Sequence, residues 1–355
     1  MIYIISTIVV LGILIFVHEM GHFIAAKIVG IRVEKFSLGF PPKIFCKKYG
    51  ETEYCLSWIP LGGYVKLSGM MDESMDNDFT DKPIQDYEYR AKKWWQKIFV
   101  TSAGVIMNLF LAILIFTIFA FQTGIPTANN EPIIDGVVQE MPAGKAGLES
   151  GDKIISIDGN EVETWNDMSE FIHNSAGREI SIKYERNDEI VSVKLIPRSE
   201  KIPIDGKVRE VGLIGVQGKI TYHPASFGEA ISAGFKTTAS WFKLTISSLG
   251  MLIKGEESVK NVGGLIQIGQ LAGESAKSGM SSLFALIAIL SVNLAFLNIL
   301  PIPALDGGHI IIALIEGVIR RELNVKVKMM IQQIGTFLLL GLIVLVMIND
   351  VLRLF

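Results

Sequence analysis

Long apolar stretches that contain almost no charged residues alternate along the chain with polar segments of ordinary composition. Each stretch is close to the ~20 residues that cross a bilayer as a helix. The pattern therefore predicts a membrane α-helical protein with four transmembrane spans, at residues 1–28, 98–121, 281–306 and 334–353.

A fifth, weaker helical pattern covers about residues 225–253, where aromatic and aliphatic residues recur at helical spacing. Glu229, Lys236 and Lys243 interrupt it, so we expect an amphipathic helix at the membrane surface rather than a fifth span. Residues 224–280 are accordingly predicted to form an extracytoplasmic helix and loop.

The segment before this helix has the pattern of a soluble α+β domain. Short β-branched runs at 136–138, 153–157 and 189–195 flank one polar helix near 165–175. About 90 residues can bury a small core of their own. We therefore expect an independent extracytoplasmic domain over residues 127–220.

Basic residues flank the spans unequally. A cluster directly precedes the second span, and a second basic group at 320–328 precedes the fourth. Cytoplasmic loops carry an excess of Lys and Arg. Residues 29–97 and 307–333 are therefore predicted to be cytoplasmic, and both termini extracytoplasmic.

Cys46 and Cys55 fall in the predicted cytoplasmic region. Neither has Cys or His neighbours at zinc-ligand spacing, and disulfides are rare in the cytoplasm. We expect reduced structural thiols rather than a disulfide or a metal site.

Composition narrows the function in one respect. Half of the 355 residues are hydrophobic, and the formal net charge is -3. A chain without a basic excess is not typical of nucleic-acid binding, so we expect no nucleic-acid partner.

The first span contains the motif His18-Glu19-Met20-Gly21-His22, or H-E-x-x-H. Residues i and i+4 share a helix face, so both imidazoles can bind one Zn²⁺ while Glu19 holds a water molecule. Such a short motif also arises by chance. Ionisable groups within a span are costly and usually functional, which favours a metal site here.

A catalytic zinc site of this kind needs a third protein ligand. After the third span, Pro301 and Pro303 end the helix and leave Asp306 among glycines at the membrane edge. With four spans, Asp306 emerges on the same side as the two histidines, so a His₂Asp site is geometrically feasible. His309 is an alternative ligand, because zinc accepts imidazole as readily as carboxylate.

Three motifs together resemble the site-2 proteases, which are intramembrane zinc metalloproteases, and in particular the bacterial regulator-of-sigma-E protease type. They are H-E-M-G-H at 18–22, A-G-V-I-M-N at 103–108 and N-I-L-P-I-P-A-L-D-G-G-H at 298–309. The resemblance implies one zinc ion per chain, with Glu19 as general base, Asn298 near the substrate backbone, and three metal ligands: His18, His22 and Asp306.

Asn108 is assigned less directly by this resemblance. The family often has Gly-Pro before this asparagine, whereas the chain has Gly104-Val105. A substrate contact by Asn108 and simple helix packing through Ala103 and Gly104 both remain open.

Residues 54–67 have the pattern of strands around a glycine turn that follows Pro60. This segment resembles the family's membrane-dipping β-loop, which would place Gly62, Gly63 and Tyr64 beside an extended substrate. The alternative is a membrane-associated cytoplasmic hairpin with a structural role only.

The string P-A-G-K-A-G-L-E-S-G-D-K-I-I-S-I-D-G-N at 142–160 resembles a single PDZ domain. PDZ domains bind extended peptides by strand addition. A bulky domain over an active site could instead act as a size filter.

The resemblance implies an intramembrane zinc metalloendopeptidase of regulated intramembrane proteolysis, in a bacterial cell membrane, with its active site toward the cytoplasm. Its expected partners are the lipid bilayer and single-span membrane proteins, such as anti-sigma factors or remnant signal peptides. The alternative from another class is a metal-binding scaffold or transporter whose histidines move an ion.

Overall fold

The computed structural model describes residues 1–70, 83–128, 130–204, 207–256, 258 and 263–353. The chain divides into two compact units. A helical unit comprises residues 1–119 and 231–355, and a β-rich unit comprises residues 120–230. Residues 71–82 of the predicted cytoplasmic region lie outside the described residues.

Four helices of the described chain are long and apolar enough to cross a membrane: α1 (Ile2–Ile28), α2 (Trp94–Thr123), α7 (Met280–Ile299) and α9 (Val325–Leu352). This agrees with the four spans expected from the sequence. The third is shorter than predicted, because Leu300 is already extended and the chain then turns at Pro301 and Pro303.

The helices pack through small residues. A Cβ atom added at Gly21 of α1 would lie 2.7 Å from the carbonyl carbon of Ala103 in α2, so the two backbones are in direct contact. Further along the same pair, Val10 and Leu14 join Ala112 in a buried apolar cluster. This close approach positions the H-E-x-x-H segment against α2.

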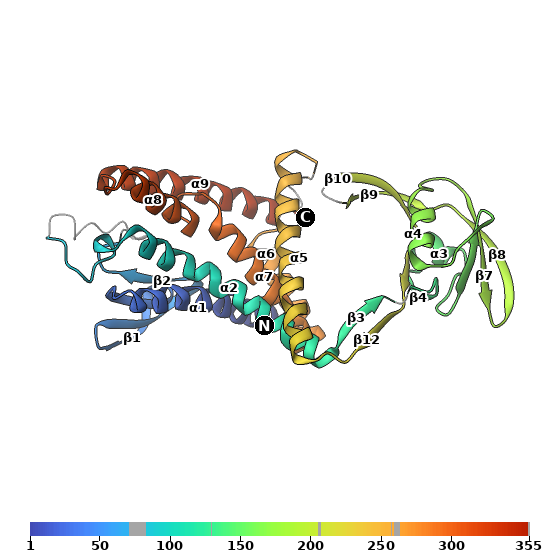
Figure 1. Cartoon of the computed structure of the whole chain (residues 1–355), viewed down its shortest axis with the longest axis horizontal. Coiled ribbons are helices and arrows are strands. Elements are labelled where there is room, and N and C mark those ends of the chain that lie inside the picture. Colours follow the sequence, from blue (N-terminus) through green and yellow to red (C-terminus); the bar gives the residue numbers. More distant parts are fainter. Residues whose placement is uncertain (71–82, 129, 205–206, 257, 259–262, 354–355) are drawn as a thin grey trace. The chain divides into compact units, whose positions relative to one another are not determined.

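The amphipathic segment forms α5 (Phe227–Ile253), which is not among the four apolar helices. Figure 1 shows it crossing the long helices at a steep angle, near the start of α1 and the end of α9. Thr245 donates a hydrogen bond to Asn293 Oδ1 of α7 at 2.8 Å. A further helix, α6 (Leu265–Ser278), stands where a loop was expected, and the Asp350 carboxylate of α9 accepts hydrogen bonds from its first turn.

The region expected to be a cytoplasmic loop contains helix α8 (Asp306–Ile319). Lys97 of α2 holds it through ion pairs to Glu316 Oε2 at 3.0 Å and to Glu322 at 2.8 Å. Lys328 of α9 also pairs with Glu316. Burial by itself would raise the pKa of Glu316, but the two lysines hold that pKa below its usual value.

Strands β1 (Val33–Tyr49) and β2 (Thr52–Leu67) form an antiparallel sheet with several register shifts. Because of these shifts, both halves of β2 pair with the same part of β1: Ser37 pairs with Tyr64 and with Cys55. The second half of β1 pairs with the first half of β2 on its other side. Residues 63–67, which we call the edge segment, therefore form one margin of the sheet.

The expectation of reduced cysteines is wrong in this structure. Cys46 and Cys55 are direct partners in the register of β1 and β2, and they form a disulfide. The sequence argument considered compartment and spacing, but it could not foresee that strand pairing places the two side chains opposite each other.

The β-rich unit contains a sheet of order β6-β5-β7-β8, formed by Asn160–Glu161, Lys153–Ile157, Ile180–Arg186 and Glu189–Leu195. Ile154, Ile157 and Ile182 of this sheet are buried with Met168 of helix α4 (Trp165–His173). Thr164 and Asp167 cap α4 reciprocally. A short helix also precedes the sheet: α3 (Pro142–Lys145).

Three two-stranded pairs complete this unit. They are β3 (Ile125–Ala128) with β12 (Ile220–His223), β4 (Ile134–Val137) with β11 (Val216–Gly218), and β9 (Arg198–Ile204) with β10 (Lys207–Leu213). The first pair closes the unit at its two chain ends. The hairpin of β9 and β10 was not anticipated.

Candidate metal centre

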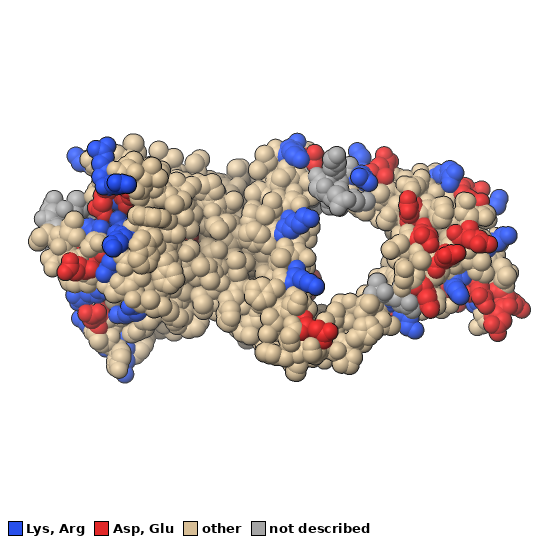
Figure 2. All heavy atoms as spheres, in the orientation of Figure 1, with Lys and Arg blue, Asp and Glu red and all other residues tan. Residues whose placement is uncertain are grey.

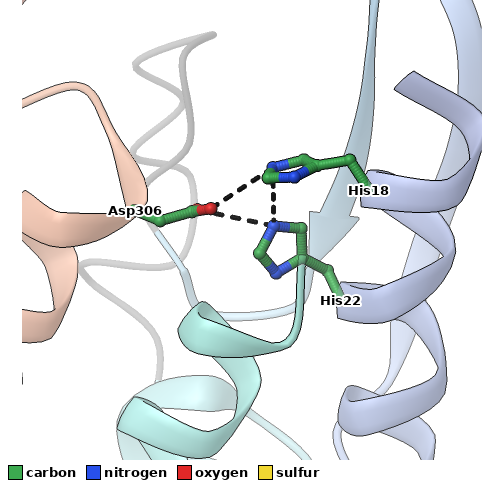
Figure 3. Close-up of side chains that lie close together, drawn as sticks. All are labelled: His18, His22 and Asp306. Atoms are coloured by element: carbon green, nitrogen blue, oxygen red, sulfur yellow. Dashed lines mark hydrogen bonds and ion pairs between the residues drawn. The ribbon is translucent and has the colours of Figure 1, made fainter. Parts of the chain in front are cut away.

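Helix α1 presents His18 and His22 on one face, one turn apart, and α8 brings Asp306 against them (Figure 3). His18 Nε2 lies 3.3 Å from His22 Nε2. The Asp306 carboxylate lies 3.2 Å from His18 Nε2 through Oδ2 and 3.4 Å from His22 Nε2 through Oδ1. Two imidazole nitrogens and the two oxygens of one carboxylate therefore converge, with 3.2–3.4 Å between the facing atoms.

These distances fit a zinc ion. With metal–ligand distances of about 2.0–2.1 Å, the ligands of a tetrahedral site are about 3.3 Å apart. Asp306 Oδ2 is buried without a hydrogen-bond partner among the described residues. A carboxylate oxygen that faces imidazole lone pairs is repelled by them unless a cation lies between.

The Nδ1 atom of each imidazole also has a polar partner. His22 Nδ1 lies 2.8 Å from the carbonyl oxygen of Val100, so it donates its N–H there. His18 Nδ1 lies 3.2 Å from the Asn108 side-chain amide, whose Oδ1 has no partner among the described residues. A half-turn of that amide exchanges its oxygen and nitrogen, and gives the His18 N–H an acceptor. Both Nε2 atoms then keep their lone pairs for a metal.

Gly104 of α2 lies directly beneath the two imidazoles. A Cβ atom at this position would overlap His22 Nε2 and would lie 2.7 Å from His18 Cε1. Any side chain here would push the histidines out of position. Packing through Ala103 and Gly104 therefore brings α2 close enough to α1 to orient the two imidazoles.

The turn before α8 aims Asp306. Ala304 has a positive φ of 82°, which non-glycine residues seldom adopt. Gly308 packs so tightly that a Cβ atom would lie 2.6 Å from the carbonyl oxygen of Ile302. The bend ends at Asp306, the first residue of α8, and directs its carboxylate toward α1.

The donors open onto a cavity of about 630 Å³. Glu19 lines it from α1, and Gly62, Gly63 and Tyr64 line it from β2. A Cβ atom at Gly63 would lie 3.4 Å from Glu19 Cγ, so the edge segment passes directly beside this carboxylate. Glycine at this position leaves the sheet margin close to Glu19.

Asn298 reaches the same cavity from the end of α7, and its Nδ2 lies 3.4 Å from His18 Nε2. Asn108, in contrast, is completely buried and does not line the cavity. The structure thus places Asn298 at the cavity wall beside His18. It places Asn108 behind His18, where it touches the ligand rather than the open space.

His309 lines the cavity but lies outside the converging group of donors. Burial lowers the pKa of the His309 imidazole below its usual value. The geometry therefore favours Asp306 over His309 as the third ligand.

Sequence reasoning missed two contributors to this site. The carbonyl of Val100 carries no side-chain signal, so no residue pattern could reveal it. Gly104 was noticed only as a packing residue, because its contact with the histidines depends on the rotation of α2 about its axis.

Comparison with known proteins gives a consistent result. Residues 6–342 match the sequence profile of peptidase family M50. A protein of Clostridium perfringens, whose name includes the words zinc metalloprotease, is 37% identical over 98% of this chain and 98% of its own length. A similarly named protein of Agrobacterium fabrum is 34% identical over 98% of this chain and 95% of its own.

Among solved structures, the PDZ domain of an SdrC-like protein from Listeria monocytogenes is similar to part of this chain. The two are 22% identical, with a TM-score of 0.20, over 26% of this chain and 90% of that domain.

Replacing Asn108 tests its role behind His18. Asn108→Leu removes the acceptor and should weaken zinc binding 10- to 100-fold, whereas Asn108→Asp keeps an oxygen and should stay closer to wild type. Zinc affinity is measured by chelator competition on purified protein. Ile106→Ala, at an exposed position of the same helix, is the control. Wild-type zinc affinity in Asn108→Leu would contradict this role.

Gly104→Ala tests the space beneath the imidazoles. The added methyl group should lower zinc affinity at least tenfold, comparable with loss of a ligand in Asp306→Ala. Gly12→Ala is the matched control, because a Cβ atom there meets no atom within 4 Å. The zinc content of each purified variant is measured by elemental analysis, and full occupancy in Gly104→Ala would show that the helices can separate to accommodate it.

Proposed function

The chain belongs to peptidase family M50, and from this premise we propose that it is an intramembrane zinc endopeptidase that cleaves membrane-spanning segments of single-span proteins. One observation carries the proposal. Three side chains that could hold a metal ion line one cavity with the Glu19 carboxylate, and helices α1, α2 and α7, which contribute to the same lining, are apolar enough to span a membrane.

His18, His22 and Asp306 would hold the zinc ion, with a fourth position left toward the cavity. Bound zinc supplies Lewis acidity, which polarises a carbonyl and lowers the pKa of a water molecule. Glu19 of α1 lines the same cavity. It would accept a proton from the attacking water and return that proton to the leaving amine.

Asn298 would act on the substrate rather than on the metal. Its amide nitrogen lies beside His18 Nε2 at the cavity wall. An N–H donor at this place can stabilise the negative charge that develops on the scissile carbonyl oxygen. The same donor would orient the peptide backbone before attack.

A substrate helix must unwind locally before its peptide bond can react, because its carbonyl groups are already hydrogen-bonded within the helix. The edge segment, residues 63–67, is the sheet margin nearest Glu19. An unwound substrate could add to this margin as a further strand, which would satisfy its backbone groups and present one bond to the metal.

The proposed orientation puts the metal centre near the cytoplasmic face, with both termini and residues 120–230 outside. The basic groups before α2 and before α9 support it, whereas the Cys46–Cys55 disulfide is unusual for a cytoplasmic region. Proposed substrates are anti-sigma factors or remnant signal peptides from which an earlier protease has removed the outer part. The β-rich unit would then exclude intact substrates by size.

A transporter is the alternative function. Transport pathways usually place polar and ionisable groups along several spans. In the described spans the charged residues and histidines lie only at the metal centre and near the helix ends, which favours proteolysis.

Glu19→Gln tests the mechanism. The variant should keep its zinc and lose 10²- to 10⁴-fold in the rate of cleavage of a single-span model substrate in detergent. Glu51→Gln, at an exposed site, is the control. Substantial cleavage by zinc-loaded Glu19→Gln would reject Glu19 as the general base.

The orientation can be tested with single cysteines in a Cys46→Ser/Cys55→Ser background. Lys254→Cys, after α5, should react with an impermeant maleimide added outside intact cells. Lys92→Cys, before α2, should react only after the membrane is opened. The reverse pattern would invert the proposed topology.

The size filter can be tested by removing residues 130–218. Strands β3 and β12 pair at the chain ends of the β-rich unit, with Ala128 opposite Ile220, so a short linker can close the gap. The shortened protein should cleave full-length substrates that the wild type leaves intact. Unchanged selectivity between full-length and shortened substrates would remove this role.

A further inference from the structure

A basic groove of about 380 Å³ lies between the start of α2 and the end of α8, away from the metal centre. Six cationic side chains and two carboxylates contribute to its lining. Both carboxylates, Glu316 and Glu322, are already paired with Lys97. The groove therefore retains a clear excess of positive charge.

Three of these cations are available to a ligand. Lys93, Arg320 and Arg321 are exposed, and none forms an ion pair with a residue that the structure describes. Arg320 ends α8 in the left-handed conformation, with φ of 53°. Figure 2 shows Lys and Arg gathered at this end of the helical unit, whereas the middle of the unit shows almost none on the face in view.

The floor of the groove is aromatic. A Cβ atom at Gly317 would lie 2.8 Å from Trp94 Cγ, so the indole ring packs directly on α8. Trp94 is the first residue of α2, a helix apolar enough to span a membrane, and it is 47% exposed. Tryptophan at the end of a span is typical of the headgroup level of a bilayer.

The apolar face of α8 is also exposed. Leu314, Ile315 and Val318 lie on one face of the helix, and Val318 is 82% exposed. Leu314 is three residues before Gly317 and four before Val318, so it is a neighbour of both on the helix surface. The cationic groove, the Trp94 ring at its floor and the exposed apolar residues of α8, which we call the apolar stripe, are therefore contiguous.

We propose that this groove binds the phosphate headgroup of an anionic phospholipid, whose acyl chains lie along the exposed face of α8. A soluble anion would use the cations but not the apolar stripe. A zwitterionic lipid would use the stripe but would gain little from the excess positive charge. Basic pockets beside membrane helices favour anionic headgroups for this reason. The proposal is independent of the proposed protease activity.

The test uses the full chain in detergent and measures bound lipid by native mass spectrometry. Phosphatidylglycerol and phosphatidylcholine with the same acyl chains are added in equal amounts. Wild type should prefer phosphatidylglycerol at least tenfold. Each cation contributes roughly fivefold, so the triple variant Lys93→Gln/Arg320→Gln/Arg321→Gln should bind this lipid about 100-fold more weakly.

The control removes the same number of charges elsewhere. Lys236→Gln/Lys243→Gln/Lys254→Gln, on and just after α5, should bind phosphatidylglycerol as the wild type does. Equal loss in both triple variants, or equal binding of the two lipids by wild type, would overturn the proposal. Glycerol phosphate is added as the soluble headgroup. If it displaces the lipid at equal concentration, the groove binds small anions and the lipid assignment is wrong.

Discussion

The close approach of α1 to α2 is the constraint on which the metal centre depends. Gly21 brings the two backbones into contact, and Gly104 leaves room for the imidazoles. The same approach puts the carbonyl of Val100 within reach of His22 Nδ1. The packing of α1 on α2 therefore sets both the separation of the two helices and the orientation of the imidazoles. A bulkier residue at Gly21 or Gly104 would change both.

Polar groups among these helices are stabilised by partners from other segments. Asp306 meets two histidines of α1, Lys97 joins α2 to α8, and the Asp350 carboxylate binds backbone N–H groups at the start of α6. An unpartnered charge in an apolar environment costs several kcal/mol. These cross-links thus restrict how the helices can rotate or slide, and they hold ligands from distant segments in one place.

Much of this architecture was accessible from the sequence. The four apolar helices follow from length and composition alone, and the H-E-x-x-H spacing predicts the shared face of His18 and His22. Asp306 could be proposed as the third ligand only after the spans were counted. The number of spans decides whether Asp306 emerges on the same side of the membrane as His18 and His22. Helix α8 was missed, since the two glycines at its start and the prolines before it resemble a loop pattern. The disulfide, the role of Gly104 and the hydrogen bond to Val100 depend on register and helix rotation, which residue patterns do not encode.

The metal ligands come from opposite ends of the chain, and this order has a consequence for biosynthesis. His18 and His22 enter the membrane with the first helix to be made, whereas Asp306 follows only after the third apolar helix has been synthesised. A nascent chain therefore carries an incomplete ligand set. The protein would therefore have no complete metal centre, and under the proposed function no proteolytic activity, until most of its chain has been made.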